Sequence, residues 1–316
     1  MSKKTPLIST NRKNFYKNAS GPVTIRLTND FLFKTLLQEN TYVLKSLICS
    51  LLHFSPAHVR NATITNPIIM GDNIKEKSFL LDVNVVFNNG SRINLEMQVV
   101  NEHDWTKRST IYACRNLSKI NKGSKYKAAK SVYQIGFLDY TLFPDHPGFY
   151  STYKLTDIKT HHIFTEMLSI RVIDLTNISL ATPEDKRYNI DKWAMLFKSN
   201  TWEDIKMLAA QDTGISSAAE TIYQLSEDER IQQECEAREE FLLRQESLYD
   251  YINTANKTIA KHEQTIKNLK NMNIEQRDTI ESLQSVNTEQ RDTIESLKKE
   301  LAGLKAKHNE QKQAPA

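Results

Sequence analysis

The chain has 316 residues, enough to bury a core and, by length alone, to form about two domains. Its net charge is a modest +4, and its three cysteines, Cys49, Cys114 and Cys235, have neither a pairing pattern nor metal-ligand spacing, which excludes a disulfide scaffold. We therefore expect a reducing, cytoplasmic environment. No stretch approaches the roughly 20 apolar residues that span a membrane, and no apolar segment follows the basic N-terminus, so neither a membrane helix nor a secretory signal is expected.

The first predicted element is a helix in the stretch TNDFLFKTLLQ. Residues 1–22, which precede it, are basic and without hydrophobic periodicity, and we expect them to be disordered. Thr28 or Asn29 is the expected N-cap of the helix. Asp30 then falls in the first turn, where the helix dipole favours an anion.

The segments that follow predict a mixed α/β domain. In chain order we expect a second helix at YVLKSLICSLL, an irregular stretch through GDNIKEK, a β-hairpin, a basic helix at about 104–121, strands at SVYQIGFL, FYSTYKLTDI and SIRVIDLTNI, and only helix from DKWAMLFKSN onward.

The hairpin segment, LLDVNVVFNNGSRINLEMQVV, places acids in the middle of both strands. A three-residue loop, 88–90, that ends in a left-handed glycine sets the register. One face is then wholly apolar and belongs to the core, with the pairs Leu81–Met97, Val83–Leu95 and Val85–Ile93. The other face has Asp82 opposite Glu96 and Asn84 opposite Asn94, with Gln98 two residues beyond Glu96.

Two like charges directly across a strand pair destabilise a hairpin, and aspartate is depleted in strand interiors. A bound divalent cation such as Mg²⁺ would remove both problems, because hard cations are held by carboxylate oxygens and water. The alternative is a polar face on which both acids project into water. The pair by itself leaves both interpretations open.

The order of elements around the hairpin resembles the αββαβ arrangement of PD-(D/E)XK nucleases, in which an Asp and the Glu of an E-x-K triplet bind metal. The closer resemblance is to the Rpn-type, transposase-associated branch of these nucleases, the recombination-promoting nucleases. The resemblance covers roughly residues 24–245. It is carried by TNDFLFK, LDVNVV, NLEMQV with Gln98 in the lysine position, Arg108-x(3)-Tyr112, KGSKYKAAKSVYQIGFL, Trp193-x(3)-Phe197 and MLAAQDTGISSAAETIYQLS.

The resemblance implies an α/β fold with a restriction-endonuclease-like αββαβ core and a Mg²⁺-dependent DNA endonuclease, associated with recombination or mobile elements. In that function Asp82, Glu96 and the backbone carbonyl of Met97 would hold the metal, while Gln98 and Arg108 would assist the reaction. Asp30 would supply a further carboxylate through water, or would only stabilise its own helix.

Several residues near these motifs have open roles. We expect Tyr112 to pack in the core, with a position facing the site as the alternative. Gln134 points into the cleft or lies on a solvated face. His103, His161 and His162 have no partner at metal spacing and are expected on the surface.

Positive charge is concentrated between residues 107 and 130, which hold eight basic residues and no acid, whereas residues 226–246 hold eight acids and three arginines. A basic patch is the usual footprint of a phosphate-rich partner, although a solvated helix face has the same pattern. The expected contacts to DNA phosphates are Lys107, Arg115, Lys119, Lys122, Lys125 and Lys127. A catalytically inactive, DNA-binding nuclease fold assembled through a coiled coil is the alternative function.

The C-terminal region has a heptad pattern, in which EQRDTIESL occurs at 275–283 and again 14 residues later at 289–297. Position a is taken by Ile266, Asn273, Ile280, Asn287, Ile294 and Leu301, and position d by Leu269, Gln276, Leu283, Gln290, Leu297 and Leu304. Isoleucine at a with leucine at d favours a parallel two-stranded coiled coil, so a homodimer is expected. A lone surface helix is the alternative.

These patterns predict five segments along the chain. They are a disordered basic N-terminus at 1–22, the nuclease-like core at 23–180, a helical extension at 181–245, a coiled coil at 246–306 and a disordered tail at 307–316.

Overall fold

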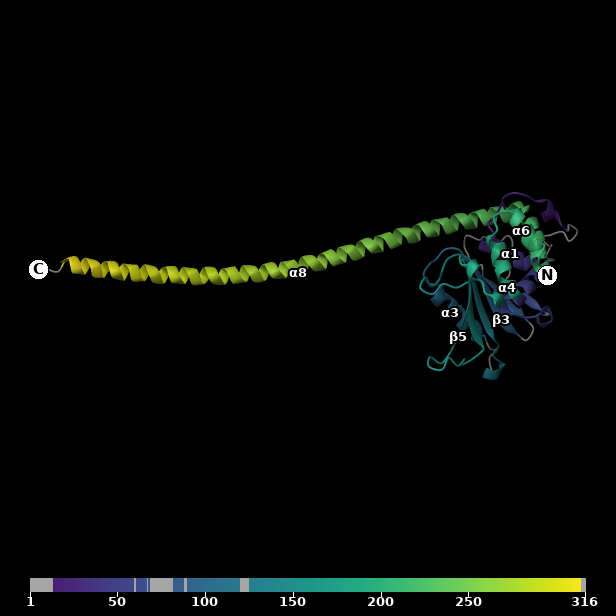
Figure 1. Cartoon of the computed structure of the whole chain (residues 1–316), viewed down its shortest axis with the longest axis horizontal. Coiled ribbons are helices and arrows are strands. Elements are labelled where there is room, and N and C mark those ends of the chain that lie inside the picture. The colour runs from purple at the N-terminus through teal and green to yellow at the C-terminus, as the bar shows by residue number, and fades with distance from the viewer. Residues whose placement is uncertain are drawn as a thin grey trace. The chain divides into compact units, whose positions relative to one another are not determined.

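The computed structural model describes residues 14–59, 61–66, 68, 82–87, 90–119 and 125–313 of the chain (Figure 1). It divides into two compact units, Met1–Leu248 and Tyr249–Ala316. The first unit contains the sheet and all helices up to the first turns of the last one, and the second is helical. Within the described ranges, no helix combines the length and apolar character needed to cross a membrane.

A six-stranded mixed sheet organises the first unit, in the order β1-β2-β3-β4-β6-β5. β3 pairs antiparallel with β2 and parallel with β4, β4 pairs parallel with β6, and β1 and β5 are antiparallel edge strands. The strands are β1 Ala62–Ile64, β2 Val83–Phe87, β3 Ser91–Gln98, β4 Val132–Leu138, β5 Tyr150–Lys154 and β6 Leu168–Asp174. The sequence did not predict β1, a strand of only three residues that pairs along β2.

The hairpin has the predicted register. Val83 pairs with Leu95, Val85 with Ile93 and Asn84 with Asn94, and Gly90 has the expected left-handed backbone, with φ of 88°. The Val and Ile side chains are at most 1% exposed in the main core. The expected partner of Met97, Leu81, and loop residues 88 and 89 lie outside the described residues.

Helices cover both faces of the sheet (Figure 1). On one face the apolar side of the hairpin joins helices on either side of it in the sequence to form the main core. These helices are α1 Asp30–Glu39, α2 Thr41–Leu52, α5 Ile190–Lys198, α6 Trp202–Ala209 and α7 Thr213–Ser226, with the short α4 Pro183–Arg187 beside them. On the other face Trp105 of α3, Trp105–Leu117, packs with Leu138 and Val172. Helix α3 is shorter than the expected 104–121, and residues 120–124 lie outside the described ranges.

Trp105 approaches the sheet closely because β4 has a glycine beneath it. A Cβ atom on Gly136 would stand 2.3 Å from Cζ2 of Trp105. In the parallel ladder Gly136 pairs with Glu96. This contact therefore fixes the start of α3 directly above the part of β3 that carries the acidic residue.

The N-terminal segment is ordered where it is described. The 3-10 helix η1, Phe15–Asn18, buries Tyr16, whose hydroxyl lies 3.0 Å from the hydroxyl of Ser216. Pro22 forms an isolated β-bridge with Thr201. The expectation of disorder is therefore wrong for residues 14–22, because an aromatic anchor and this bridge hold the segment, and residues 1–13 lie outside the described part.

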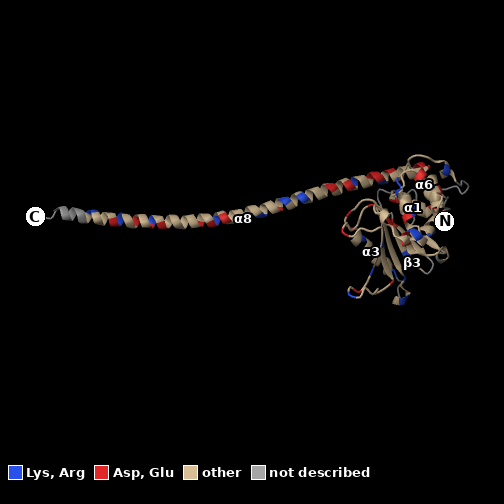
Figure 2. Cartoon of the chain, in the orientation of Figure 1, with Lys and Arg blue, Asp and Glu red and all other residues tan. Residues whose placement is uncertain are grey.

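The last helix, α8, runs from Glu229 to Gln313. The acidic segment recognised in the sequence forms its first turns (Figure 2). The helix continues through the segment 307–313 that was expected to be disordered, which corrects that boundary. In the second unit the apolar residues at a and d are more than half exposed, for example Ile280 at 53% and Leu283 at 63%.

Candidate metal and nuclease site

A cavity of about 100 Å³ opens where β3 ends. Its lining comes from α1, the residue before β2, the end of β3 with the segment that follows it, α3 and the first turns of α8. The lining residues are Asp30, Asp82, Glu96, Met97, Gln98, Val99, Val100, Glu102, Arg108, Tyr112, Arg238 and Leu242. All residues predicted to hold metal or to act in catalysis lie in this one cavity.

Of the titratable groups that line the cavity, Glu96 has the largest shift in pKa. Its side chain is 12% exposed, and its Oε1 accepts a 2.7 Å contact from Nη2 of Arg108. Its other oxygen, Oε2, is buried and has no hydrogen-bond partner in the described part of the chain. Burial raises the pKa of Glu96 to about 7; Arg108 opposes this, while the charges of Asp82, Asp104 and Glu102 add to it.

Asp82 lies one residue before β2, at the position where the hairpin register leads to Glu96. Its Oδ2 accepts a hydrogen bond of 2.6 Å from Nδ2 of Asn84, and its backbone carbonyl accepts one of 2.8 Å from Asn66. Asn66 also accepts from the backbone N–H of Asn84. Asn66 therefore holds the chain at Asp82 in place, and the negative charge of Asp82 raises the pKa of Glu96.

Gln98 and Met97 complete this side of the cavity. Gln98 is 8% exposed, and its Oε1 is buried without a hydrogen-bond partner among the described residues. The side chain of Met97 belongs to the main core, so its backbone is the part that is left to face the cavity. The end of β3 thus brings a carboxylate, an amide oxygen and backbone to the same small space.

Arg108 connects the cavity to α3. Its guanidinium contacts Glu96 at 2.7 Å and Glu102 at 3.1 Å. Tyr112, one turn further along α3, is half-buried and lines the cavity, so the expected core position is wrong and the alternative, facing the site, is observed. Glu102 was not predicted as a site residue, because it lies after the end of β3, where strand periodicity no longer indicates a direction.

Asp30 binds a partner that the sequence did not reveal. Its carboxylate receives two contacts from Nε of Arg238, at 2.9 and 3.0 Å, and one from Nη2 at 2.6 Å. Both side chains are about one-tenth exposed. Asn29, the N-cap of α1, also donates to the backbone oxygen of Cys235 at 3.0 Å. The first turns of α8 are therefore fastened to the start of α1 and form a wall of the cavity.

Lys34 is a third cation close to the acids, after Arg108 and Arg238. It lies on α1 one turn after Asp30 and is only 4% exposed. Burial lowers its pKa, and the nearby charge of Asp82 opposes that effect. The motif TNDFLFK thus contributes both an acid and a buried lysine to this region.

The remaining predicted residues lie outside the cavity lining. Gln134 is fully buried and accepts a 3.0 Å hydrogen bond from Asn94, so it is neither in the cleft nor solvated, which corrects both expectations. Lys107, Arg115 and Lys119 are exposed on or just after α3. Lys127 lies on the 3-10 helix η3, Tyr126–Ala128, and Lys125 directly precedes it. Lys122 lies outside the described residues. His103, His161 and His162 are exposed, as expected.

The cavity contains oxygen atoms of the kind that bind divalent cations. No group of three or more His, Cys, Asp or Glu side chains at metal-binding spacing occurs within the described ranges. The cavity has four acids in its lining, of which Asp30 is paired with Arg238 and Glu102 with Arg108. Asp82 and Glu96 remain as candidate ligands beside the Gln98 amide oxygen and backbone, and two buried acceptor atoms, Glu96 Oε2 and Gln98 Oε1, have no hydrogen-bond partner among the described residues. Buried acceptors without donors are costly, and an oxygen-binding cation would satisfy them. These residues therefore fit such a cation.

The site is built on an αββαβ core, formed by α1, the hairpin β2–β3 with its two acids, α3 and the parallel strand β4. This core, with carboxylates at a strand end, is the arrangement of the PD-(D/E)XK class. The family model described as PD-(D/E)XK nuclease family transposase matches residues 27–252, and the chain belongs to this family. No curated protein and no solved structure matches the sequence. The matched region includes the cavity and its wall from α8.

Proposed function

We propose that this protein is a divalent-metal-dependent endonuclease that hydrolyses phosphodiester bonds in DNA, in association with recombination or mobile elements. The observation that carries the proposal is the pair of buried acceptor atoms without donors, Glu96 Oε2 and Gln98 Oε1, in one cavity with Asp82. Family membership supports the same reaction class.

In this proposal Asp82, Glu96 and the carbonyl of Met97 hold Mg²⁺ or another divalent cation. When bound, such a cation lowers the pKa of water and polarises a phosphate. Glu96 must first lose its proton, since the buried side chain has a pKa of about 7.

Gln98 and Arg108 act on the substrate side. The Gln98 amide orients water through its oxygen or donates to a phosphate oxygen through its nitrogen, but it brings no positive charge. The guanidinium of Arg108 is shared between Glu96 and Glu102. With Glu96 as a ligand of the cation, the guanidinium of Arg108 would donate to a phosphate oxygen of the transition state.

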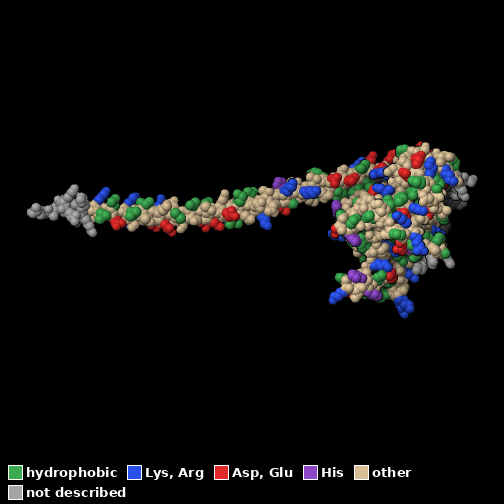
Figure 3. Space-filling view, in the orientation of Figure 1, with side chains coloured by type: hydrophobic (Ala, Val, Ile, Leu, Met, Phe, Trp, Pro, Cys, Tyr) green, Lys and Arg blue, Asp and Glu red, His purple; other side chains and the backbone are tan. Residues whose placement is uncertain are grey.

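Binding to DNA and pairing of two copies complete the proposal. Exposed cations on α3, such as Lys107 and Arg115, contact backbone phosphates without reading sequence. The exposed apolar residues at a and d of α8 pair with those of a second copy in a parallel coiled coil, which buries a stripe that is otherwise in water (Figure 3). Two copies would bring two sites to one duplex.

A plasmid-nicking assay with Mg²⁺ tests the function. We expect Asp82→Ala and Glu96→Ala to abolish cutting, while Glu166→Ala, which removes a 68% exposed carboxylate outside the cavity, keeps it. Equal cutting by all four proteins would show that the site is assigned wrongly.

A second candidate is a catalytically inactive nuclease fold that binds DNA and assembles through α8. It is favoured by the amide of Gln98 in the lysine position of the family motif. Calorimetric titration with Mg²⁺ or Mn²⁺ separates the two functions. The inactive fold predicts no cation binding at the cavity, no cutting, and DNA affinity that falls steeply as salt rises.

A further inference from the structure

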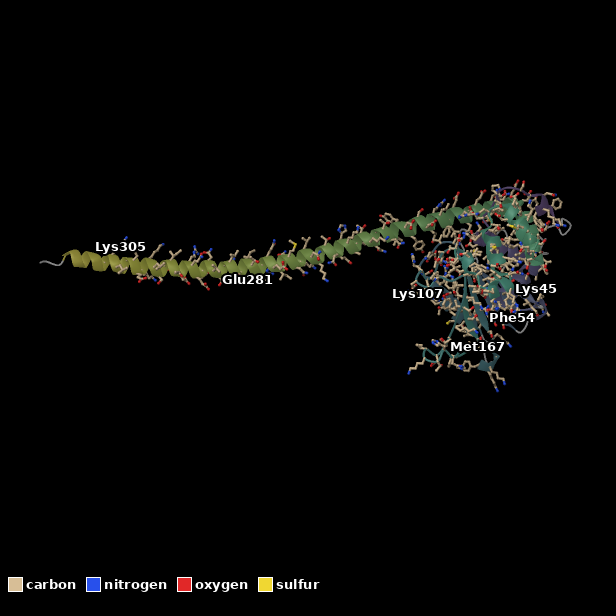
Figure 4. The ribbon with its side chains drawn as sticks, in the orientation of Figure 1. Lys45, Phe54, Lys107, Met167, Glu281 and Lys305 are labelled. Atoms are coloured by element: carbon tan, nitrogen blue, oxygen red, sulfur yellow. The ribbon has the colours of Figure 1, made fainter. Side chains whose placement is uncertain are left out.

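The end of the sheet opposite the cavity has a surface of its own. The cavity lies at Gln98, where β3 ends, whereas the segment before β4 and the connection between β5 and β6 lie at the start of β3. Arg92 N–H donates to Ser131 O at 2.9 Å, and Val132 N–H donates to Met167 O at 2.8 Å. Met167 marks this end in Figure 4. Seven strand steps, at about 3.3 Å each, separate the two ends by roughly 23 Å.

The β5–β6 connection forms an ordered hairpin at residues 155–164, called here the hairpin tip. Phe164 N–H donates to Leu155 O, and Asp157 N–H donates to His162 O, each at 2.9 Å. The Asp157 carboxylate accepts hydrogen bonds from the backbone N–H groups of Lys159 and Thr160. The tip therefore has a defined shape before any partner binds, which lowers the entropy cost of binding.

Large apolar side chains project from this end into solvent. Ile158 on the hairpin tip is 90% exposed and Phe164 is 78% exposed. Tyr126 on η3 is 92% exposed. Single exposed apolar residues are common. Three of them at one end of the sheet, on two ordered segments that project there, the hairpin tip and η3, indicate a contact surface.

The same two projections are rich in cations (Figure 3). The exposed lysines are Lys125, Lys127 and Lys130, on or beside η3, and Lys159 on the hairpin tip, where His161 and His162 are also exposed. The two acids near these lysines have other partners. The Asp157 carboxylate accepts hydrogen bonds from backbone N–H groups of its own turn, and Glu166 forms an ion pair with Lys154 at 2.6 Å. Exposed lysines around apolar side chains match a duplex, whose backbone is anionic and whose grooves accept apolar side chains.

We propose that the hairpin tip and η3 form a second contact for duplex DNA, distinct from the cavity. The lysines bind backbone phosphates, and Ile158 and Phe164 enter a groove. The two ends of β3 are about 23 Å apart, which corresponds to roughly seven base pairs at 3.4 Å each, and the hairpin tip extends further past the start of the strand. A single duplex longer than about seven base pairs therefore reaches both the cavity and this surface. The inference rests on the proposed function only for the choice of DNA as the partner.

Binding of a labelled 24-base-pair duplex, measured by fluorescence anisotropy in EDTA over a range of salt, tests the surface. For Lys125→Gln with Lys127→Gln we expect the slope of log affinity against log salt to fall by about 2. For Ile158→Ser with Phe164→Ser we expect about tenfold weaker binding with an unchanged slope. Lys186→Gln with Arg187→Gln, which removes two exposed cations from α4, should match wild type.

The two double variants at this surface are Lys125→Gln with Lys127→Gln and Ile158→Ser with Phe164→Ser. If both have the salt slope and DNA affinity of wild type, the proposal is overturned. It is also overturned if wild type binds phosphatidylserine vesicles, both double variants lose that binding, and their DNA binding is unchanged. The substituted side chains are exposed, and unfolding followed by tryptophan fluorescence checks that each variant folds. The binding measurement does not depend on DNA cutting, so its result remains valid if the nicking assay shows no activity. If nicking is normal but both double variants bind DNA like wild type, only the second contact is refuted.

Discussion

Replacing Glu96 with glutamine should make the stability of the first unit less dependent on pH. The substitution mimics the protonated side chain in size and removes its titration. The unfolded chain ionises Glu96 near the ordinary pKa of 4.5, whereas the folded chain does so at about 7. Between these values the folded state holds more protons, so the Glu96 contribution to stability is present at low pH and is lost as pH rises through 7.

The size of the effect follows from the two pKa values. Each unit of difference corresponds to about 1.4 kcal/mol, so the full contribution is roughly 3 kcal/mol. Integrated from pH 5 to pH 8, the loss for wild type is about 2.5 kcal/mol. The side chain is only 12% exposed, so screening by solvent reduces this value little.

The measurement is urea unfolding in EDTA at several pH values, followed by tryptophan fluorescence. The three tryptophans, Trp105, Trp193 and Trp202, are buried in the first unit and report on it alone. The unfolding free energy of Glu96→Gln, minus that of wild type, should grow by about 2.5 kcal/mol from pH 5 to pH 8. Glu166→Gln is the matched control, and its difference should change by less than about 0.5 kcal/mol.

A difference that stays constant with pH for Glu96→Gln would refute the reasoning, because it would mean that Glu96 is ionised in the folded protein at pH 5. Addition of Mg²⁺ extends the test. If the cation binds the ionised carboxylate, saturating Mg²⁺ should stabilise wild type at pH 8 and leave Glu96→Gln nearly unchanged.

Three further predictions concern packing and assembly. Arg238→Ala leaves the buried carboxylate of Asp30 unpaired and should cost about 3 kcal/mol or more of unfolding free energy, whereas the double variant with Asp30→Asn should recover much of that loss in urea unfolding. Gly136→Ala forces its new Cβ against Trp105 and should cost about 1 to 3 kcal/mol in the same assay, so wild-type stability would contradict the close packing. Removal of residues 249–316 should convert a dimer into a monomer in analytical ultracentrifugation, and a monomeric full-length chain would refute the coiled coil.

The local part of this site was predictable from the sequence. Alternation of apolar and polar residues around Gly90 determines which side chains of the hairpin enter the core, and the observed register has Val83 opposite Leu95 as predicted. The same alternation places Glu96 and Gln98 on the other face. Asn29 at the start of α1 was also predictable, because an N-cap satisfies nearby backbone donors.

Only the tertiary structure decided which groups surround these residues. Asp30 pairs with Arg238, 208 positions away in the chain, and no periodicity or spacing connects two residues at that separation. Tyr112 lines the cavity and Gln134 is fully buried, because the placement of α3 on the sheet depends on the contact between Trp105 and Gly136. Patterns in sequence specify the faces of individual elements, whereas the partners of a side chain depend on how distant elements pack.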